Sequence, residues 1–267
     1  MRLTALADSW RHRWLLGSLL HRELRNRYAG TSGGLVWVFI HPVLMLAIYA
    51  VVFQYVFQVK MPNADPTQPY VVWVAVTLWP WLAFSEALSR GTVAVQQHAD
   101  LVKKVAFPQE LLVYSAVLTS LLIHAAGYLA VLLLLWAWGY DIQVGHVLLA
   151  GLWAWVVLGC AATGLALFLG ALQIFLRDVE QLLGQFLTML FFATPVLYPL
   201  ALAPAALRDA LAFNPLVHVL EPLRGAALGQ GLPHPAVLIV ALGVAAALWV
   251  LGLAWFRRLS PHFEDQL

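Results

Sequence analysis

Few side chains in this sequence could carry out acid–base, nucleophilic or metal chemistry. Inside the long apolar stretches the titratable residues are His41 and His124, and Glu86 lies near the end of one stretch. The single cysteine, Cys160, excludes a disulfide framework and a thiolate metal site within the chain. Neither H-E-x-x-H nor G-x-x-x-x-G-K-[ST] occurs, so the zinc-hydrolase and nucleotide-binding motifs are missing. We expect no catalytic site, no metal and no cofactor on this chain.

The sequence gives little support for ion-driven transport, because few ionisable side chains lie in its apolar stretches. An ion-coupled transporter usually carries Asp, Glu, His or Arg inside its membrane spans to bind the coupling ion. His41 and His124 are the candidates, and a lone intramembrane histidine is more often a hydrogen-bonded packing residue than a proton relay. If the protein moves a substrate uphill, we expect the energy to come from another chain. An ion-driven carrier, or a membrane assembly factor without a motor, is the competing interpretation.

A polar loop could contact such a separate motor. Residues 96–108 form a short amphipathic segment that ends at Pro108, with Leu101, Val102, Val105 and Phe107 available to dock on a partner. An ordinary basic loop that only sets the topology explains the pattern equally well. Residues 177–180 form a second polar turn, which could also be a solvated turn with a local ion pair.

The segment from residue 199 to 235 is unusually apolar for an exposed loop. Six prolines interrupt it, so it cannot be one long helix. Two short amphipathic segments fit between the prolines, at 205–213 and 216–228. Apolar loop residues outside the lipid suggest re-entrant or interfacial helices that cap an opening.

Several aromatic residues lie deeper than an interfacial belt would place them. Aromatic faces can stack on sugar rings and let them slip past, which suits a conduit for a polymer. Plain helix packing is the simpler explanation for any one of them. The candidate conduit residues are Tyr49, Phe53, Trp73, Trp81 and Phe84.

These residues must be positioned by membrane helices. The 267-residue chain is 62% hydrophobic and 10% charged, with a net charge of +2, which excludes a soluble domain and a nucleic-acid binder. A spanning helix needs roughly 20 apolar residues. Small residues at four-residue spacing, Ala162, Ala166 and Gly170, favour close helix contact. We predict an all-α protein with six transmembrane helices, at 35–57, 70–84 (continuing to about 88), 111–138, 147–176, 182–202 and 236–256.

The basic residues predict the orientation. With a cytoplasmic N-terminus, most of the 15 Lys and Arg residues fall on the cytoplasmic side. Both termini are then cytoplasmic. Residues 1–30 are predicted to form a basic amphipathic helix in the headgroup layer, with Trp10, Trp14, Leu20 and Leu24 on its apolar arc. A helix packed on a neighbouring element is the alternative.

An ordered set of short strings resembles the permease subunits of ATP-binding-cassette type-2 exporters for O-antigen, related surface polysaccharides and teichoic acid. The strings cover nearly the whole chain, and their order makes the set specific. They lie at residues 22–28 (RELRNRY), 37–42 (WVFIHP), 78–81 (LWPW), 101–108 (LVKKVAFP), 177–179 (RDV), 194–199 (TPVLYP) and 214–216 (NPL).

The resemblance implies a single permease domain over 1–267 that works as a homodimer with two copies of a separate ATPase, which binds ATP and Mg²⁺. It implies a multi-pass protein of the bacterial inner membrane that exports a glycan on undecaprenyl diphosphate. A lipid or small-molecule efflux permease of the same class is the alternative. Residues 99–108 would be the coupling helix, and 199–235 would hold the periplasmic gate helices. The implied ATPase contacts are Asp100, Leu101, Val102, Lys103, Lys104 and Phe107.

The Arg-rich N-terminal helix would lie near the lipid diphosphate in such a transporter. Arg22, Arg25 and Arg27 are the candidate contacts, and topology alone is the simpler explanation of their charge.

Overall fold

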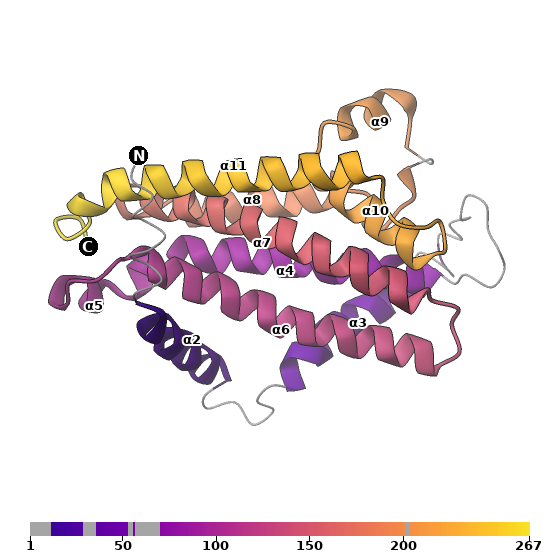
Figure 1. Cartoon of the computed structure of the whole chain (residues 1–267), viewed down its shortest axis with the longest axis horizontal. Helices are drawn as coiled ribbons and strands as arrows, with labels where there is room; N and C mark the ends of the chain where they lie inside the picture. The colour runs from indigo at the N-terminus through magenta and orange to yellow at the C-terminus, as the bar shows by residue number, and fades with distance from the viewer. Residues whose placement is uncertain (1–11, 29–35, 53–55, 57–69, 201–202) are drawn as a thin grey trace.

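The computed structural model describes residues 12–28, 36–52, 56, 70–200 and 203–267, and all secondary structure in these ranges is helical (Figure 1). Phe53 and the first part of the predicted N-terminal helix lie outside the described residues, as does the side chain of His41. The helices are α2 (Arg13–Tyr28), α3 (Val36–Val51), α4 (Tyr70–Gln97), α5 (Ala99–Lys104), α6 (Glu110–Ala137), α7 (Val144–Phe175), α8 (Val179–Phe192), α9 (Ala205–Leu211), α10 (Val217–Ala227) and α11 (Pro235–Leu259).

Four helices of the described chain are long and apolar enough to cross a membrane: α4, α6, α7, and α11 with the short turn after it (Pro235–His262). The predicted spans at 35–57 and 182–202 appear as shorter helices, α3 with 16 residues and α8 with 14. The helix predicted to continue to residue 202 ends at Phe192. It stops because Pro195 has no N–H to continue the ladder and disfavours helix in the residue before it.

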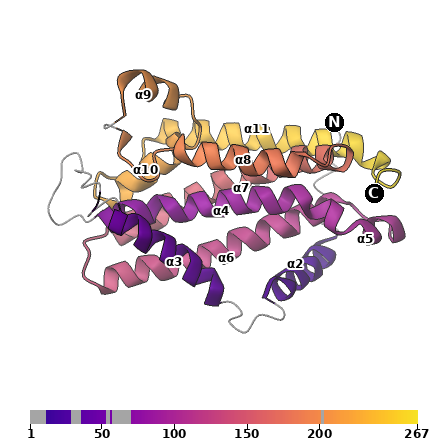
Figure 2. The ribbon, with the colours of Figure 1, turned by 180° about the vertical axis from the view of Figure 1, so that it is seen from behind.

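Helix α4 forms the centre of the bundle. It packs against α6 and α7, and α11 packs on α7. Its tryptophans Trp73, Trp79 and Trp81 are all buried. Figure 2 shows α4 from the other side, between α8 and α3.

Small residues bring the core helices together, as the four-residue spacing predicted. A Cβ on Gly91 of α4 would meet Ala166 of α7, and Gly170 of α7 lies against the Thr92 backbone. The closest approach is between α7 and α11. There a Cβ on Gly252 would overlap the carbonyl oxygen of Gly164, so the two backbones are in direct contact.

The short helices lie at opposite ends of the bundle. Helix α5 lies at the same end as the C-terminus, while α9 and α10 lie at the other end (Figure 1). The gate segments predicted at 205–213 and 216–228 coincide with α9 and α10, which begin and end within a few residues of those limits. The helix predicted within 99–108 is α5, and it ends earlier, at Lys104.

Helix α2 packs against α6. Its contact face differs from the predicted apolar arc, because Leu15, Leu16 and Leu19 face the core while Trp14 is 82% exposed. These leucines share one side of the helix at spacings of one, three and four residues, whereas Trp14 points away from it. The described part of the N-terminal helix is therefore attached to the bundle on one side and open on the other.

Candidate functional site

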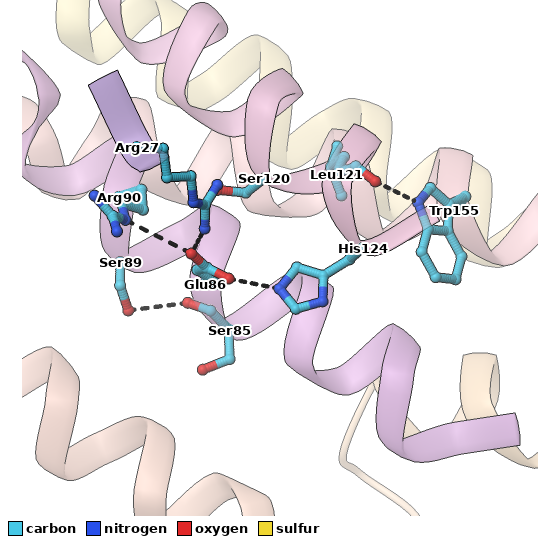
Figure 3. A network of polar contacts seen from close by, with 9 residues as sticks. All are labelled: Arg27, Ser85, Glu86, Ser89, Arg90, Ser120, Leu121, His124 and Trp155. Atoms are coloured by element: carbon cyan, nitrogen blue, oxygen red, sulfur yellow. Dashed lines mark hydrogen bonds and ion pairs between the residues drawn. The ribbon is translucent and has the colours of Figure 1, made fainter. Parts of the chain in front are cut away.

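A cluster of charged side chains joins α2, α4 and α6 (Figure 3). The Glu86 carboxylate of α4 forms ion pairs with Arg27 of α2 and, at 3.6 Å, with Arg90 one turn further along α4. His124 Nε2 of α6 lies 2.5 Å from the other carboxylate oxygen of Glu86. Arg27 also donates to Ser120 Oγ at 3.4 Å. His124 thus holds Glu86 in place, in agreement with its interpretation as a packing residue.

The three candidate diphosphate contacts differ in position. Arg27 is 8% exposed and its guanidinium lies against Glu86, so it ties the end of α2 to α4. Arg22 and Arg25 are exposed on the outside of α2. The diphosphate role stays a prediction, and Arg22 and Arg25 are the side chains that a lipid headgroup could reach directly.

One side of α4 near this cluster is incompletely covered by the rest of the subunit. Glu86 and Arg90 are 30% and 42% exposed. Ser85 and Ser89 are also partly exposed, and all four side chains leave α4 on the same side (Figure 3). The Ser89 hydroxyl donates to the Ser85 carbonyl at 2.9 Å.

Three of the five candidate conduit aromatics, Tyr49, Trp81 and Phe84, belong to one cluster inside the subunit. Phe191 of α8 lies 5.7 Å from Trp81 and 6.2 Å from Tyr49, measured between ring centroids. Trp81 in turn contacts Phe84 at 6.1 Å. Trp81 and Phe84 are buried and Tyr49 is half-buried, so the cluster joins α3, α4 and α8. Lining of a conduit by these residues stays a prediction.

Trp73, the fifth conduit candidate, contacts a buried arginine at the opposite end of the bundle from α5. The Arg224 guanidinium of α10 lies 3.5 Å from the centroid of the Trp73 ring. It donates to Thr77 Oγ1 at 2.8 Å and to the Pro195 carbonyl at 2.7 Å, and pairs with Glu221. Burial lowers the pKa of Arg224 to about 10, which still leaves it protonated at neutral pH. Arg224 therefore ties α10 to α4 and to the turn after α8.

The same turn is held by a second contact. Asn214 donates through Nδ2 to Thr194 Oγ1 at 2.9 Å and to the Ala193 carbonyl at 3.1 Å. Its Oδ1 accepts from the Leu216 N–H at 3.0 Å, just before α10 begins. The Thr194–Pro195 and Asn214–Pro215 strings are thus in contact, and together they fix where α10 starts.

Helix α5 presents a mixed surface at the other end. Asp100, Lys103 and Lys104 are exposed, as is Val105 directly after the helix. Val102 is 2% exposed, and Leu101 and Phe107 pack partly against the core. The buried side chains attach α5 to the bundle, and the charged ones leave a surface available to a partner. The ATPase-coupling role stays a prediction for all six residues.

A buried glutamine connects the helix ends next to α5. Gln173 of α7 donates to Gln96 Oε1 of α4 at 2.9 Å and to the Arg177 carbonyl at 3.2 Å. Its own Oε1 accepts from the Glu180 N–H at 2.8 Å, in the first turn of α8. One side chain thus links α4, α7 and α8 at the end of the bundle that carries α5.

Sequence reasoning missed three of these residues. Gln173 was part of an apolar stretch, Arg224 was counted only as a loop charge, and Glu86 was noted only as the end of a span. The available signal was their polarity in an apolar setting, because buried polar side chains need partners. Their partners lie too far along the chain for the sequence to identify; Arg224 and Thr77, for example, are 147 positions apart.

Comparison with known proteins identifies the family. Residues 15–228 match the ABC-2 type transporter family. An O-antigen export system permease protein of Myxococcus xanthus is 32% identical over 264 residues, which cover 97% of this chain and 98% of the relative. An O-antigen export permease of Klebsiella pneumoniae is 24% identical, with 95% of each chain covered. The polysialic acid transport protein of Escherichia coli is 25% identical, covering 90% of this chain and 91% of the relative. This chain, an apolar helical bundle with short helices at both ends, belongs to the ABC-2 type transporter family.

Proposed function

We propose that this chain is the membrane-spanning subunit of an ATP-driven exporter that moves a lipid-linked, O-antigen-like polysaccharide from the cytoplasm to the periplasm. The observation that carries the proposal is the end-to-end similarity to polysaccharide export permeases, which covers nearly the whole of both chains. A match of that extent includes α5 at one end of the bundle and α9 and α10 at the other. The alignment therefore includes the short helices at both ends of the bundle.

The proposed complex is a homodimer of this chain with two copies of a separate ATPase in the bacterial inner membrane. The ATPase would bind ATP and Mg²⁺ and supply the energy. In the proposed topology α3 and α8 complete six spans, and both termini are cytoplasmic. The basic residues support this orientation, because Lys103, Lys104, Arg257 and Arg258 gather at the end that carries α5.

ATP binding would act on this subunit through α5. Exposed Lys103 and Lys104 suit an electrostatic contact with the ATPase, while buried Val102 transmits its movement to the bundle. Since α5 follows α4 after a single residue, a shift of α5 displaces the end of α4. Gln173 then carries the displacement from Gln96 to the start of α8. A shift of α5 would thus move α4 and α8 together.

Helices α9 and α10 would close the periplasmic end. Their role as a gate is supported by their position opposite α5 and by the contacts that hold α10. Arg224 and Asn214 both bond to the turn that ends α8. A movement of α8 would therefore reach α10 directly, which connects the two ends of the subunit.

Deletion of the gene tests the proposal. Surface glycan and glycan still attached to its undecaprenyl diphosphate carrier are counted with a radiolabelled sugar. The proposal predicts loss of surface glycan and accumulation of carrier-linked glycan inside the cell, both reversed by a plasmid copy of the gene. Unchanged surface glycan would remove this substrate and favour lipid or small-molecule efflux.

A further inference from the structure

The outward faces of the described bundle are apolar almost everywhere. Leu182, Phe186 and Met189 on α8 are exposed, as are Ile239 and Leu251 on α11. Such faces suit contact with lipid tails or with another apolar surface. A polar surface at the same depth needs a different neighbour, because hydrocarbon offers no hydrogen-bond partner.

One side of α4 is such a polar surface. Residues 85, 86, 89 and 90 lie within an arc of about 140° on the helix, because residues four apart lie one above the other and successive residues are about 100° apart. All four are partly exposed, while residues 83, 84, 87, 88 and 91–95 of the same helix are buried. We call Ser85, Glu86, Ser89 and Arg90 the α4 polar stripe.

The stripe lies in the half of α4 that is nearer to α5. Glu86 is sixteen positions after Tyr70, at the start of α4, which at about 1.5 Å per residue is roughly 24 Å and falls within the roughly 30 Å of hydrocarbon counted from that end. Its partner His124 lies near the middle of α6. An ionisable side chain at this depth is costly against lipid and faces protein or a water-filled space.

The chemistry of the stripe indicates the kind of ligand. It offers a carboxylate that accepts, a guanidinium that donates and hydroxyl groups that do both. A hydroxyl-bearing chain matches this mixture, because each hydroxyl also donates and accepts. A diphosphate matches it less well, because its oxygens only accept hydrogen bonds and therefore offer no donor to the Glu86 carboxylate.

A large cavity among the described helices is a poor alternative site for such a ligand. It measures about 590 Å³, lies between α7, α8, α10 and α11, and is lined almost wholly by apolar side chains such as Leu158, Leu190 and Val240. It lacks the dense hydrogen-bonding groups that a glycan would need.

We propose that the α4 polar stripe borders the export path and binds the hydroxyl groups of the passing glycan. This inference rests on the proposed function and names the site at which its substrate is held. Arg27 and His124 act as positioning residues, because they hold the Glu86 carboxylate on the stripe.

Cysteine accessibility tests the site. The only native cysteine is replaced (Cys160→Ala), and Ser85→Cys or Ser89→Cys is introduced into the full complex with its ATPase. Inside-out vesicles then receive a charged, membrane-impermeant methanethiosulfonate. The matched control is Thr163→Cys on α7, a half-buried hydroxyl residue that likewise bonds to its own helix, at the Gly159 carbonyl, but lines an apolar groove. Co-purification of the ATPase shows that each variant has folded.

The expected result is labelling at positions 85 and 89 at least about tenfold faster than at 163, in vesicles without glycan. Vesicles loaded with the carrier-linked glycan, without ATP, should label about tenfold more slowly, as expected for a site occupied nine-tenths of the time. Labelling no faster than at 163 would overturn the proposal. Equal protection by the diphosphate carrier without sugar would overturn it too, and would assign the stripe to the headgroup.

Different results would refute the proposed export function and the proposed glycan contact of the α4 polar stripe. Labelling without glycan measures water access to the stripe whatever the substrate is. Failure of the export function appears instead as unchanged surface glycan after deletion of the gene.

Discussion

Single polar residues hold this apolar bundle together at specific points. Glu86, Gln173 and Arg224 each connect helices that are distant in sequence. Their partners are side chains, backbone carbonyls and, for Gln173, a backbone N–H. The polarity of these residues was visible in the sequence. Their partners were not, because helix packing brings them together across as many as 147 positions.

The pair of Arg27 and Glu86 should behave as a unit. Replacing Glu86 removes the carboxylate that lies against the buried Arg27 guanidinium, whereas replacing Arg27 leaves Glu86 with His124 and Arg90. A fully buried pair that loses one partner costs about 3–5 kcal/mol, and the partial exposure of Glu86 makes the expected loss smaller here. We expect Arg27→Gln and Glu86→Gln each to lower the thermal unfolding midpoint of the purified protein clearly. The double variant should recover part of the loss, through a coupling energy of about 1–3 kcal/mol. Arg25→Gln, exposed on the same helix, is the control; additive losses in the double variant would contradict the pairing.

Arg224 should be replaceable by neither methionine nor lysine. Methionine loses every hydrogen bond, and lysine cannot span Thr77, the Pro195 carbonyl and the Trp73 face as the planar guanidinium does. We expect each variant to lose about 3 kcal/mol of stability, measured by thermal unfolding in detergent. Arg208→Met on the exposed part of α9 should change little. Full stability of Arg224→Lys would show that charge alone suffices.

The boundaries of the elements were predictable where prolines and polar residues define them. Helices α9 and α10 appear almost where the proline spacing placed them. Helix α8 was predicted too long, because Pro195 lies in an apolar run that hydropathy alone reads as continuous. The side of α2 that packs against α6 was not predicted, since a leucine-rich helix offers more than one apolar side and only the neighbouring helix selects between them.

The contact between α7 and α11 gives a sharp prediction about one glycine. Gly252→Leu would force a side chain into the carbonyl of Gly164. We expect separation of the two helices and loss of folded protein on size-exclusion chromatography. Gly243→Leu on the same helix is a matched control, because nothing lies within 4 Å of a Cβ there. Equal behaviour of the two variants would contradict the close contact.

The surface of α5 gives a prediction about coupling. Lys103→Glu combined with Lys104→Glu reverses two exposed charges and leaves buried Val102 in place. We expect the ATPase to be lost from the purified complex while the permease keeps its unfolding midpoint. Arg208→Glu, at the opposite end of the bundle, should retain the ATPase. An intact complex with both lysines reversed would show that α5 is not the electrostatic contact.

At the scale of the whole molecule, the arrangement of the two ends explains how one chain could turn an ATPase movement into export. Helix α5 and the Gln173 contacts lie at one end, and α10 with Arg224 lies at the other. Helix α4 contacts both α5 and α10, while α8 begins at the Gln173 contacts and ends at the turn that Arg224 holds. Composition and the order of short strings were enough to predict a helical transporter subunit. The polar stripe on α4 emerged only from the packing, because burial decides which side of a helix remains open.

Reconstitution tests the central claim most directly. The permease and its ATPase are placed in vesicles with a radiolabelled, carrier-linked glycan on the ATPase side, and the glycan reaching the other side is measured by its release with an impermeant glycosidase. The account predicts transfer that requires the permease, the ATPase and ATP together, and that stops with Lys103→Glu and Lys104→Glu. Transfer without ATP, or no transfer by a complex that hydrolyses ATP, would contradict it.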